Sequence, residues 1–176
     1  MSAPIGAFDA HPEFEQLHIL RDRRSRAVVV VAIHDTRLGP AFGGIRRWQY
    51  SDVGAAVADA QALAAAMTCK SAISGLDSGG GKAVLVDGGD LDRRAAYEFV
   101  GDLVEQLGGR FFTGPDVNTT EDDLRVVAGR TRYCANPDDD GFRGLADSTA
   151  RGVFAAARAT AAHLGAPLEG LRVLVQ

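Results

Sequence analysis

Lysine is almost absent from this 176-residue sequence, since 17 of its 19 basic residues are arginine and two, Lys70 and Lys82, are lysine. Arginine serves wherever a surface needs positive charge alone, but its guanidinium does not lose its proton. Two lysines placed twelve residues apart, on either side of the most glycine-rich segment, therefore favour a chemical role for a compact amine. Chance placement of two surface lysines is the alternative.

Cysteine, blocks of positive charge and long apolar runs are also scarce. Two cysteines, Cys69 and Cys134, make no disulfide framework, and their scarcity is typical of a reducing compartment. The formal net charge of −4 offers no basic surface for nucleic acid, and no uncharged stretch reaches bilayer length. Residues 1–14 lack the basic and apolar regions of a secretion signal. We therefore expect a soluble, cytoplasmic protein with no nucleic-acid and no membrane partner.

The usual signatures of metal and nucleophile sites are missing as well. The four histidines are scattered, at His11, His18, His34 and His163, and no cysteine–histidine pair or nucleophile elbow is present. The acidic run at residues 138–140 lies between a proline and a glycine, without histidine or glutamate at ligand spacing. We interpret it as a solvated loop and expect no metal site.

Apolar residues follow two periods along the chain, which indicates strands alternating with helices. From Val53 to Lys70 they keep the three- and four-residue spacing of an amphipathic helix, with Ser51 as its cap. Thr120 and Asp123 have the spacing of a capping box. The expected strands cover residues 27–33, 41–50, 83–86, 110–113 and 171–175, and the expected helices 51–70, 91–107, 120–129 and 148–164. This order predicts an α/β fold in which helices flank a mixed sheet.

A glycine-rich segment, Ser-Gly-Gly-Gly-Lys, occupies residues 78–82. A phosphate loop of the Walker type would need glycine at position 76 and serine or threonine at 83, where the chain has Leu76 and Ala83. We expect residues 75–81 to form a loop whose bare backbone a small ligand can approach closely. Lys82 would then project into a cleft from the start of a strand. A flexible surface loop with an exposed lysine is the alternative.

Asp116 follows an expected strand, inside the turn Gly-Pro-Asp, and precedes an expected helix. Loops at the carboxyl ends of strands are where α/β proteins place site residues, so Asp116 is a candidate for the same site as Lys82. The alternative is a turn aspartate that bonds to the local backbone, which is the commoner role of a lone aspartate in a turn.

Taken together and in order, six segments resemble the leucine, phenylalanine and valine dehydrogenases of the glutamate dehydrogenase superfamily. The two lysine motifs also keep the twelve-residue separation of that family. The matching segments are residues 34–46 (HDTRLGPAFGGIR), 67–70 (MTCK), 79–83 (GGGKA), 114–120 (GPDVNTT), 149–154 (TARGVF) and 168–176 (LEGLRVLVQ). Residues 143–148 depart from the serine- and proline-containing approach that the family has before its hinge-side helix.

The resemblance implies roles for the matching residues. Lys82 would be the general base that activates water against the imine left by hydride transfer, and Asp116 would handle the proton of the amino group. Two nearby ammonium groups disfavour each other's charge, which agrees with a base whose pKa is lowered towards neutral. The substrate would be bound by Lys70, which holds its carboxylate with the Gly43–Gly44 backbone, and by Phe42, Met67 and Pro115. Thr149 would contact the cofactor.

The resemblance further implies an NAD-dependent, homo-oligomeric enzyme that reversibly deaminates an apolar L-amino acid to its 2-oxo acid. Residues 1–166 would be the substrate-binding, catalytic and dimerisation domain, and residues 167–176 the first strand of a truncated nucleotide-binding domain. The truncated chain would be inactive by itself. The alternatives are a glutamate-type dehydrogenase and a non-catalytic assembly or ligand-binding domain. Phe42 disfavours the first, because glutamate-specific members carry a lysine there.

Overall fold

The computed structural model describes residues 13–139 and 145–174. The chain divides into two compact units, Met1–Pro137 and Asp138–Gln176, and each is described by itself. The first unit contains the sheet and three helices, and the second contains one helix with the segment after it.

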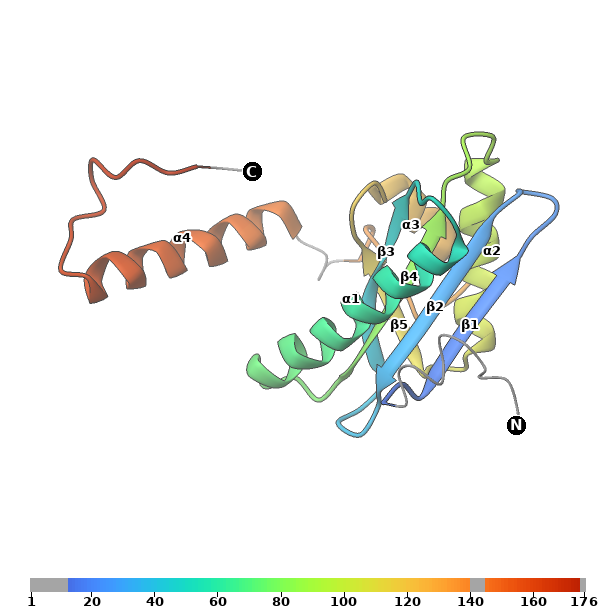
Figure 1. Cartoon of the computed structure of the whole chain (residues 1–176), viewed down its shortest axis with the longest axis horizontal. Helices are drawn as coiled ribbons and strands as arrows, with labels where there is room; N and C mark the ends of the chain where they lie inside the picture. Colours follow the sequence, from blue (N-terminus) through green and yellow to red (C-terminus); the bar gives the residue numbers. More distant parts are fainter. Residues whose placement is uncertain (1–12, 140–144, 175–176) are drawn as a thin grey trace. The chain divides into compact units, whose positions relative to one another are not determined.

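The first unit is built on one mixed five-stranded sheet, as the sequence predicts (Figure 1). Its spatial order is β1-β2-β4-β3-β5. The strands are β1 (Gln16–Arg21), β2 (Val28–Asp35), β3 (Ala41–Trp48), β4 (Gly79–Val86) and β5 (Phe111–Pro115). The pairs β1/β2 and β2/β4 are antiparallel, whereas β3 pairs in parallel with both β4 and β5. The carboxyl ends of β3, β4 and β5 therefore lie at the same edge of the sheet.

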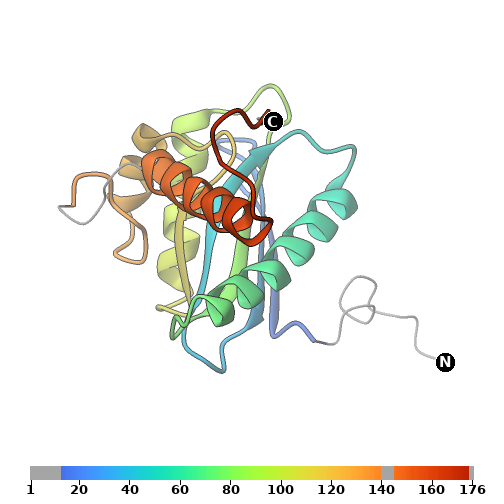
Figure 2. The same ribbon diagram turned by 90° about the vertical axis from the view of Figure 1, so that its left-hand side faces the viewer.

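Helices cover both faces of this sheet. Helix α1 (Val53–Ile73) lies on one face, and α2 (Arg93–Gln106) with α3 (Glu121–Ala128) lies on the other (Figure 2). Alanines of α1 pack against valines of β2 and β4, which brings the helix close to the sheet. The members of this core cluster that carry the contact are Ala56, Ala60, Ala64, Val30 and Val84.

The helix starts are partly as predicted. The capping box of Thr120 and Asp123 is confirmed at the start of α3. The cap of α1 is Asp52 and not Ser51, because the Asp52 carboxylate accepts the backbone N–H of Ala55. Strand β1 was not among the expected elements, and it pairs along the free edge of β2.

The prediction of a loop over residues 75–81 is wrong for residues 79–81, which form the start of β4. Each of these glycines lies where a Cβ would collide with the protein itself. A Cβ on Gly79 would lie 1.7 Å from the carbonyl oxygen of Asp35, and one on Gly80 would lie 2.2 Å from the backbone nitrogen of Thr68. The glycines therefore permit close packing of a strand and a helix, a recognised use of glycine inside strands.

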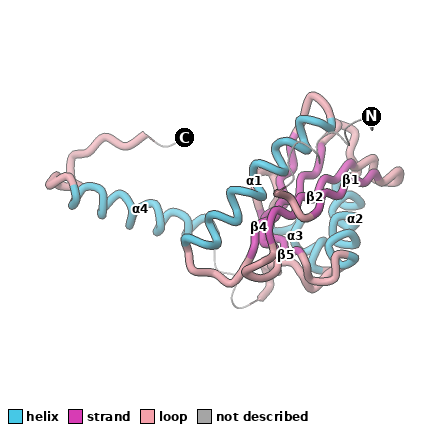
Figure 3. Tube along the Cα trace, turned by 60° about the horizontal axis from the view of Figure 1, so that its bottom comes forward, coloured by secondary structure: helices cyan, strands magenta, loops and turns pink. Residues whose placement is uncertain are grey.

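The second unit consists of α4 (Leu145–His163) and an irregular segment up to residue 174 (Figure 3). The helix ends at His163, and the turn after it contains Gly165, whose φ of +65° suits glycine, as the sequence predicts. The expected strand over 171–175 is wrong for residues 171–174, and residue 175 lies outside the described part of the chain. No neighbouring strand pairs with the described part of this segment, so its backbone groups gain no ladder hydrogen bonds.

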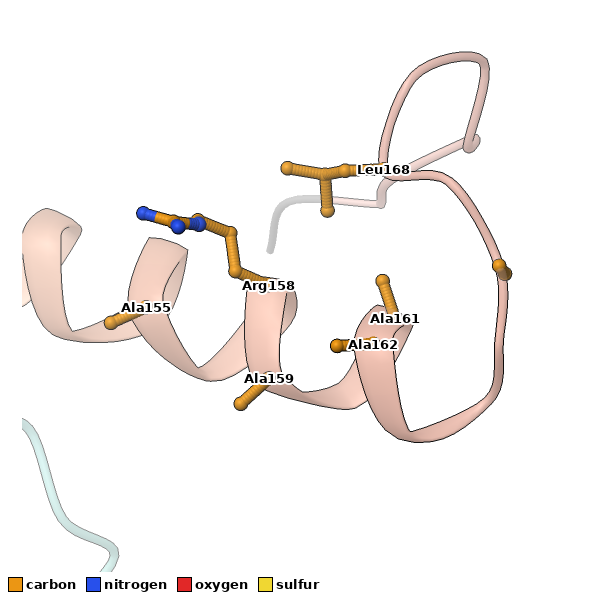
Figure 4. A pocket seen from close by; sticks show the side chains of 7 residues that line it. Ala155, Arg158, Ala159, Ala161, Ala162 and Leu168 are labelled. Atoms are coloured by element: carbon orange, nitrogen blue, oxygen red, sulfur yellow. The ribbon is translucent and has the colours of Figure 1, made fainter.

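A hollow of about 510 Å³ lies between α4 and the segment that follows it (Figure 4). Its lining is aliphatic except for Arg158, and alanines provide most of it. Because one guanidinium is the sole charged group there, this hollow offers no pair of groups for acid–base chemistry.

Candidate active site

Within the described residues of the first unit, no helix covers one face of the sheet over β3 and β5. The register pairs Phe42 of β3 with Gly80 of β4 and with Phe112 of β5, so the even-numbered residues of these strands share a face. Gly80 lies under Thr68 of α1, which makes this the α1 face. Because α1 packs on β2 and β4 and scarcely contacts β3, side chains such as Trp48 stay exposed on the open part.

Lys82 projects from β4 on this face of the sheet and forms an ion pair with Asp116. Its side chain is 6% exposed, and its Nζ lies 2.6 Å from Oδ2 of Asp116, which follows the end of β5. The alternative of an exposed lysine on a flexible loop is therefore wrong. Asp116 contacts side chains from two other strands, since Oδ2 also accepts a hydrogen bond from Nε of Arg46 at 3.1 Å.

Arg46 links Asp116 to a second carboxylate. Its Nη1 lies 3.0 Å from Oδ2 of Asp59 on α1, and the hydroxyl of Tyr50 donates to the same oxygen at 2.5 Å. The result is a continuous chain from Lys82 through Asp116, Arg46 and Asp59 to Tyr50. A hollow of about 490 Å³ adjoins this chain, lined by Arg46, Trp48, Tyr50, Asp59 and Val117.

The electrostatic surroundings lower the pKa values of both members of the central pair. Burial lowers the pKa of Lys82; the bond to Asp116 opposes this, and the charges of Arg46 and Lys70 reinforce it. Burial alone would raise the pKa of Asp116, but the bond to Lys82 and the charge of Arg46 outweigh it, so this pKa is lowered. The arrangement keeps the carboxylate ionised while making the amine easier to deprotonate.

Lys70 lies near this pair with its ammonium uncommitted. It is exposed in the last turn of α1 and makes no ion pair within the described residues. Its charge is one of the effects that lower the pKa of Lys82. Met67, three residues earlier on the same helix, is half-buried. The structure thus brings both lysines to one region, one buried and paired and the other free to meet an anion.

The glycines of β3 set how closely the strands approach around the pair. A Cβ on Gly43 would lie 1.7 Å from the carbonyl oxygen of Gly81, and one on Gly44 would lie 2.3 Å from the carbonyl oxygen of Pro115 and 2.9 Å from Cβ of Asp116. Gly44 therefore allows Asp116 to lie directly beside β3.

An apolar wall borders the same face. The Phe42 side chain is exposed, and its ring end would lie 4.0 Å from a Cβ placed on Gly114. Phe112 on β5 is also partly exposed and makes an edge contact with Tyr133, with ring centroids 5.2 Å apart. The missing side chain at Gly114 leaves apolar space between Phe42 and Ala135, whose Cβ would lie 3.6 Å from the added atom.

A match to a family model identifies the protein family of this chain. The model of the Glu/Leu/Phe/Val dehydrogenase dimerisation domain matches residues 19–133, which include Lys70, Lys82 and Asp116. The chain belongs to the Glu/Leu/Phe/Val dehydrogenase family. The family that the sequence motifs resemble is thereby confirmed.

Individual relatives of this dehydrogenase domain agree with that assignment. The valine dehydrogenase of Streptomyces coelicolor is 41% identical over 155 residues, which cover 85% of this chain and 42% of the relative. The phenylalanine dehydrogenase of Lysinibacillus sphaericus is 40% identical over 170 residues, covering 93% and 44%. The crystal structure of L-tryptophan dehydrogenase from Nostoc punctiforme matches with a TM-score of 0.66 and 38% identity, over 69% of this chain and 37% of that one. The chain spans less than half the length of these relatives.

The remaining expectations from the sequence concern Thr149, metal ligands, membrane spans and the acidic run. Thr149 lies in α4, in the second unit, and is exposed. Within residues 13–139 and 145–174, no cluster of three or more histidine, cysteine or acidic side chains is placed to hold a metal ion. None of the helices described here has the length and apolar character needed to cross a bilayer. Residue 140 of the acidic run, and residues 143 and 144, lie outside the described part of the chain.

Three residues of this cluster were not predicted as site residues from the sequence: Arg46, Asp59 and Tyr50. Arg46 stands in a matching motif two residues after Gly44, and strand alternation puts both on the open face. Asp59 precedes Lys70 by eleven residues, which is about three helical turns and hence the same stripe of α1. These two spacings are the sequence features from which Arg46 and Asp59 could have been predicted as site residues.

Proposed function

We propose that the chain forms the N-terminal, substrate-binding and catalytic part of an NAD-dependent amino-acid dehydrogenase. The reaction converts an apolar L-amino acid, NAD⁺ and water into the 2-oxo acid, ammonium, NADH and a proton, and it is reversible. The observation that carries the proposal is the ion pair between the buried Lys82 and Asp116, together with the uncommitted ammonium of Lys70, whose charge acts on Lys82. Perturbed titratable groups in a cleft are typical of catalytic sites.

Lys70 is the proposed anchor for the substrate carboxylate. Its exposed ammonium has no ion pair among the described residues, so it meets an anion without first breaking a bond. The positive charge of Lys70 is one of the effects that lower the pKa of Lys82. A substrate carboxylate bound to Lys70 therefore neutralises one of the charges that act on the buried amine.

Lys82 is the proposed general base. Removal of hydride from Cα of the amino acid leaves an imine, and hydrolysis of that imine requires a water molecule to lose a proton as it attacks the carbon. A neutral amine at Lys82 accepts that proton, and its lowered pKa makes the neutral form available nearer to neutral pH. Asp116 is the proposed group that exchanges the proton of the substrate amine, since its lowered pKa keeps it a carboxylate.

Phe42 and Phe112 support an apolar side chain on the substrate. Both rings are partly exposed on the face that carries Lys82, and Gly114 leaves space between Phe42 and Ala135. A distal carboxylate placed against a phenyl ring would lose its hydration without gaining a partner, which is costly. We therefore expect glutamate to be a poor substrate. Met67, Pro115 and the Gly43–Gly44 backbone remain proposed substrate contacts.

NAD is the proposed hydride acceptor, as the family resemblance implies. The glycine-rich segment does not form a cradle for its pyrophosphate, because the space around Gly79 and Gly80 is filled by the chain's own atoms. We propose that the cofactor binds mainly to a nucleotide-binding domain that begins with residues 167–176, and that Thr149 contacts it. The relatives, which are more than twice as long as this chain, support that division.

A homo-oligomer is the proposed assembly. The matching family model is named for a dimerisation domain, and β1 forms an edge of the sheet, next to β2 alone. An edge strand exposes unpaired backbone groups that a second copy of the chain satisfies by strand pairing. A cytoplasmic location remains the expectation from the scarcity of cysteine.

The proposal is tested by comparing kcat/KM for valine, leucine, phenylalanine and glutamate on the full-length protein with NAD. We expect turnover of at least one apolar amino acid and a glutamate value at least about a hundredfold lower, the scale on which unpaired buried groups discriminate. A preference for glutamate would refute the apolar pocket. Absence of turnover on all four by a folded, NAD-binding protein would favour a non-catalytic domain instead.

A further inference from the structure

Arg46 holds two carboxylates from different parts of the fold. It projects from β3, and it contacts Asp116 after β5 through Nε and Asp59 on α1 through Nη1. A guanidinium presents several donors in a rigid planar fork, so it joins two carboxylates in a fixed geometry, whereas the rotating donors of a lysine ammonium set no such geometry. The two bonds of Arg46 therefore connect the sheet edge that carries Asp116 to α1, the helix that also carries Lys70.

Asp59, the second carboxylate that Arg46 bonds, is itself held in place by a hydrogen bond. The Tyr50 hydroxyl donates to Oδ2 of Asp59, the oxygen that also accepts from Arg46. Burial, followed by the adjacent Asp59 carboxylate, raises the pKa of Tyr50, so the hydroxyl stays protonated and remains a donor. The Arg46 side chain is 24% exposed, and among the described residues both of its ion-pair partners belong to this cluster.

We propose that Arg46, held by Asp59 and Tyr50, is a positioning residue that fixes the Asp116 carboxylate against Lys82. Arg46 does not touch the reacting atoms, and it acts through Asp116. The consequence for turnover rests on the dehydrogenase function proposed above, whereas the consequence for the ionisation of Lys82 does not.

The groups that act on Lys82 come from every element around it. Asp116 after β5 favours the charged amine, whereas Arg46 on β3 and Lys70 on α1 disfavour it. On β2 the titratable group of this face is His34, whose Nδ1 is hydrogen-bonded to Oγ1 of Thr68 on α1. Removing Arg46 takes away a repulsion, which raises the pKa of Lys82, and it loosens the Asp116 carboxylate, which lowers it. Because Asp116 then has Lys82 as its one remaining side-chain partner among the described residues, we expect the lost repulsion to be the larger effect and the pKa of Lys82 to rise.

The chain offers a matched control in Arg47. This neighbour is 21% exposed and also forms an ion pair, but it points to the opposite face, where it contacts Asp87 and the backbone of Asn118. Arg47→Gln therefore removes a half-buried arginine with its ion pair while leaving the Arg46–Asp116 contact in place.

The first experiment measures the titration of Lys82 directly. Because the chain has two lysines, labelling lysine with ¹³C at Cε produces signals from two residues, and Lys70→Arg assigns them. In the 176-residue chain we expect Arg46→Gln to raise the pKa of Lys82 by about one unit, the size typical of a nearby charge, and Arg47→Gln to leave it unchanged. Equal pKa values in the wild type and the Arg46→Gln variant would overturn the proposal, whatever reaction the protein catalyses.

The second experiment uses the full-length enzyme and separates charge from geometry. Arg46→Lys keeps the charge but loses the rigid fork that fixes both carboxylates, so we expect kcat to fall about tenfold with KM nearly unchanged and the acid limb of the pH profile in place. Arg46→Gln should move that limb to higher pH. Wild-type kcat in Arg46→Lys would contradict the positioning role, and this variant keeps the test decisive where Arg46→Gln does not fold. A full-length protein without dehydrogenase activity would refute the proposed function and leave the lysine titration standing.

Discussion

Replacing Lys82 by methionine removes the ammonium while keeping most of the length and volume of the side chain. In the full-length enzyme we expect kcat to fall by about 10²–10⁴-fold, the usual contribution of a general base. This corresponds to about 2.7–5.4 kcal/mol of transition-state stabilisation, at roughly 1.36 kcal/mol for each factor of ten. KM for the amino acid should change little, because the proposed carboxylate anchor, Lys70, is untouched.

The fold should survive this substitution. Asp116 keeps its bond to Arg46, so the variant leaves no isolated carboxylate behind, and the burial of an ammonium is avoided. We expect the free energy of unfolding to stay within about 1–2 kcal/mol of the wild type, well below the cost of stranding a buried charge. Urea unfolding of the same preparations shows whether lost activity reflects lost structure.

Lys70→Met provides the contrast. Its exposed ammonium anchors the substrate in our account, so its loss should raise KM by about 10–100-fold, the value of a charge-assisted hydrogen bond, with a smaller effect on kcat. Steady-state kinetics with a saturating cofactor resolves the two parameters. The reasoning is refuted if the two variants exchange their effects, or if both retain wild-type kinetics.

Four further outcomes are expected. Phe42→Lys should raise kcat/KM for glutamate at least about tenfold, because a salt-bridging cation then lies at the apolar wall; an unchanged ratio of glutamate to valine would contradict this. Gly80→Ala should cost more than about 3 kcal/mol in urea unfolding, since its Cβ would meet the Thr68 backbone at 2.2 Å, whereas Gly152→Ala, with no atom within 4 Å, should be neutral or stabilising. Asp123→Asn should cost about 1–3 kcal/mol of the free energy of unfolding at pH 7. Burial raises the pKa of Asp123, but the bond to Arg93 outweighs it and the pKa is lowered. The wild type therefore has the full stabilisation above the ordinary pKa of an aspartate and loses it as the pH falls through the lowered pKa. The 176-residue chain by itself should produce no NADH from amino acids, and robust production would show that our division of the cofactor site is wrong.

Local patterns predicted the elements whose signals are local. The Thr120–Asp123 capping box and the apolar stripe of α1 depend on neighbours within a few residues, and both are present. Lys82 and Asp116 were each predicted as site residues from the strands that they adjoin, and the parallel strands bring them together. Strand β1 was missed because, at the edge of the sheet, it lacks a continuous buried apolar run.

The remaining differences come from contacts between distant segments. Residues 79–81 look like a loop because glycine is common in loops, but here the absent side chains make room for Asp35, Thr68 and the Phe111 ring. No local pattern reveals that requirement. Likewise, the bond between Arg46 and Asp59 joins a strand to a helix, and it becomes visible once the helix lies on the sheet.

The most direct test of the account is the product balance of the full-length enzyme, measured in parallel for the wild type and Lys82→Met. With an apolar amino acid and NAD, the account predicts one NADH, one ammonium ion and one 2-oxo acid for each substrate molecule consumed by the wild type, and loss of all three products together in the variant. NADH formation without stoichiometric ammonium, or an unchanged rate in Lys82→Met, would contradict it.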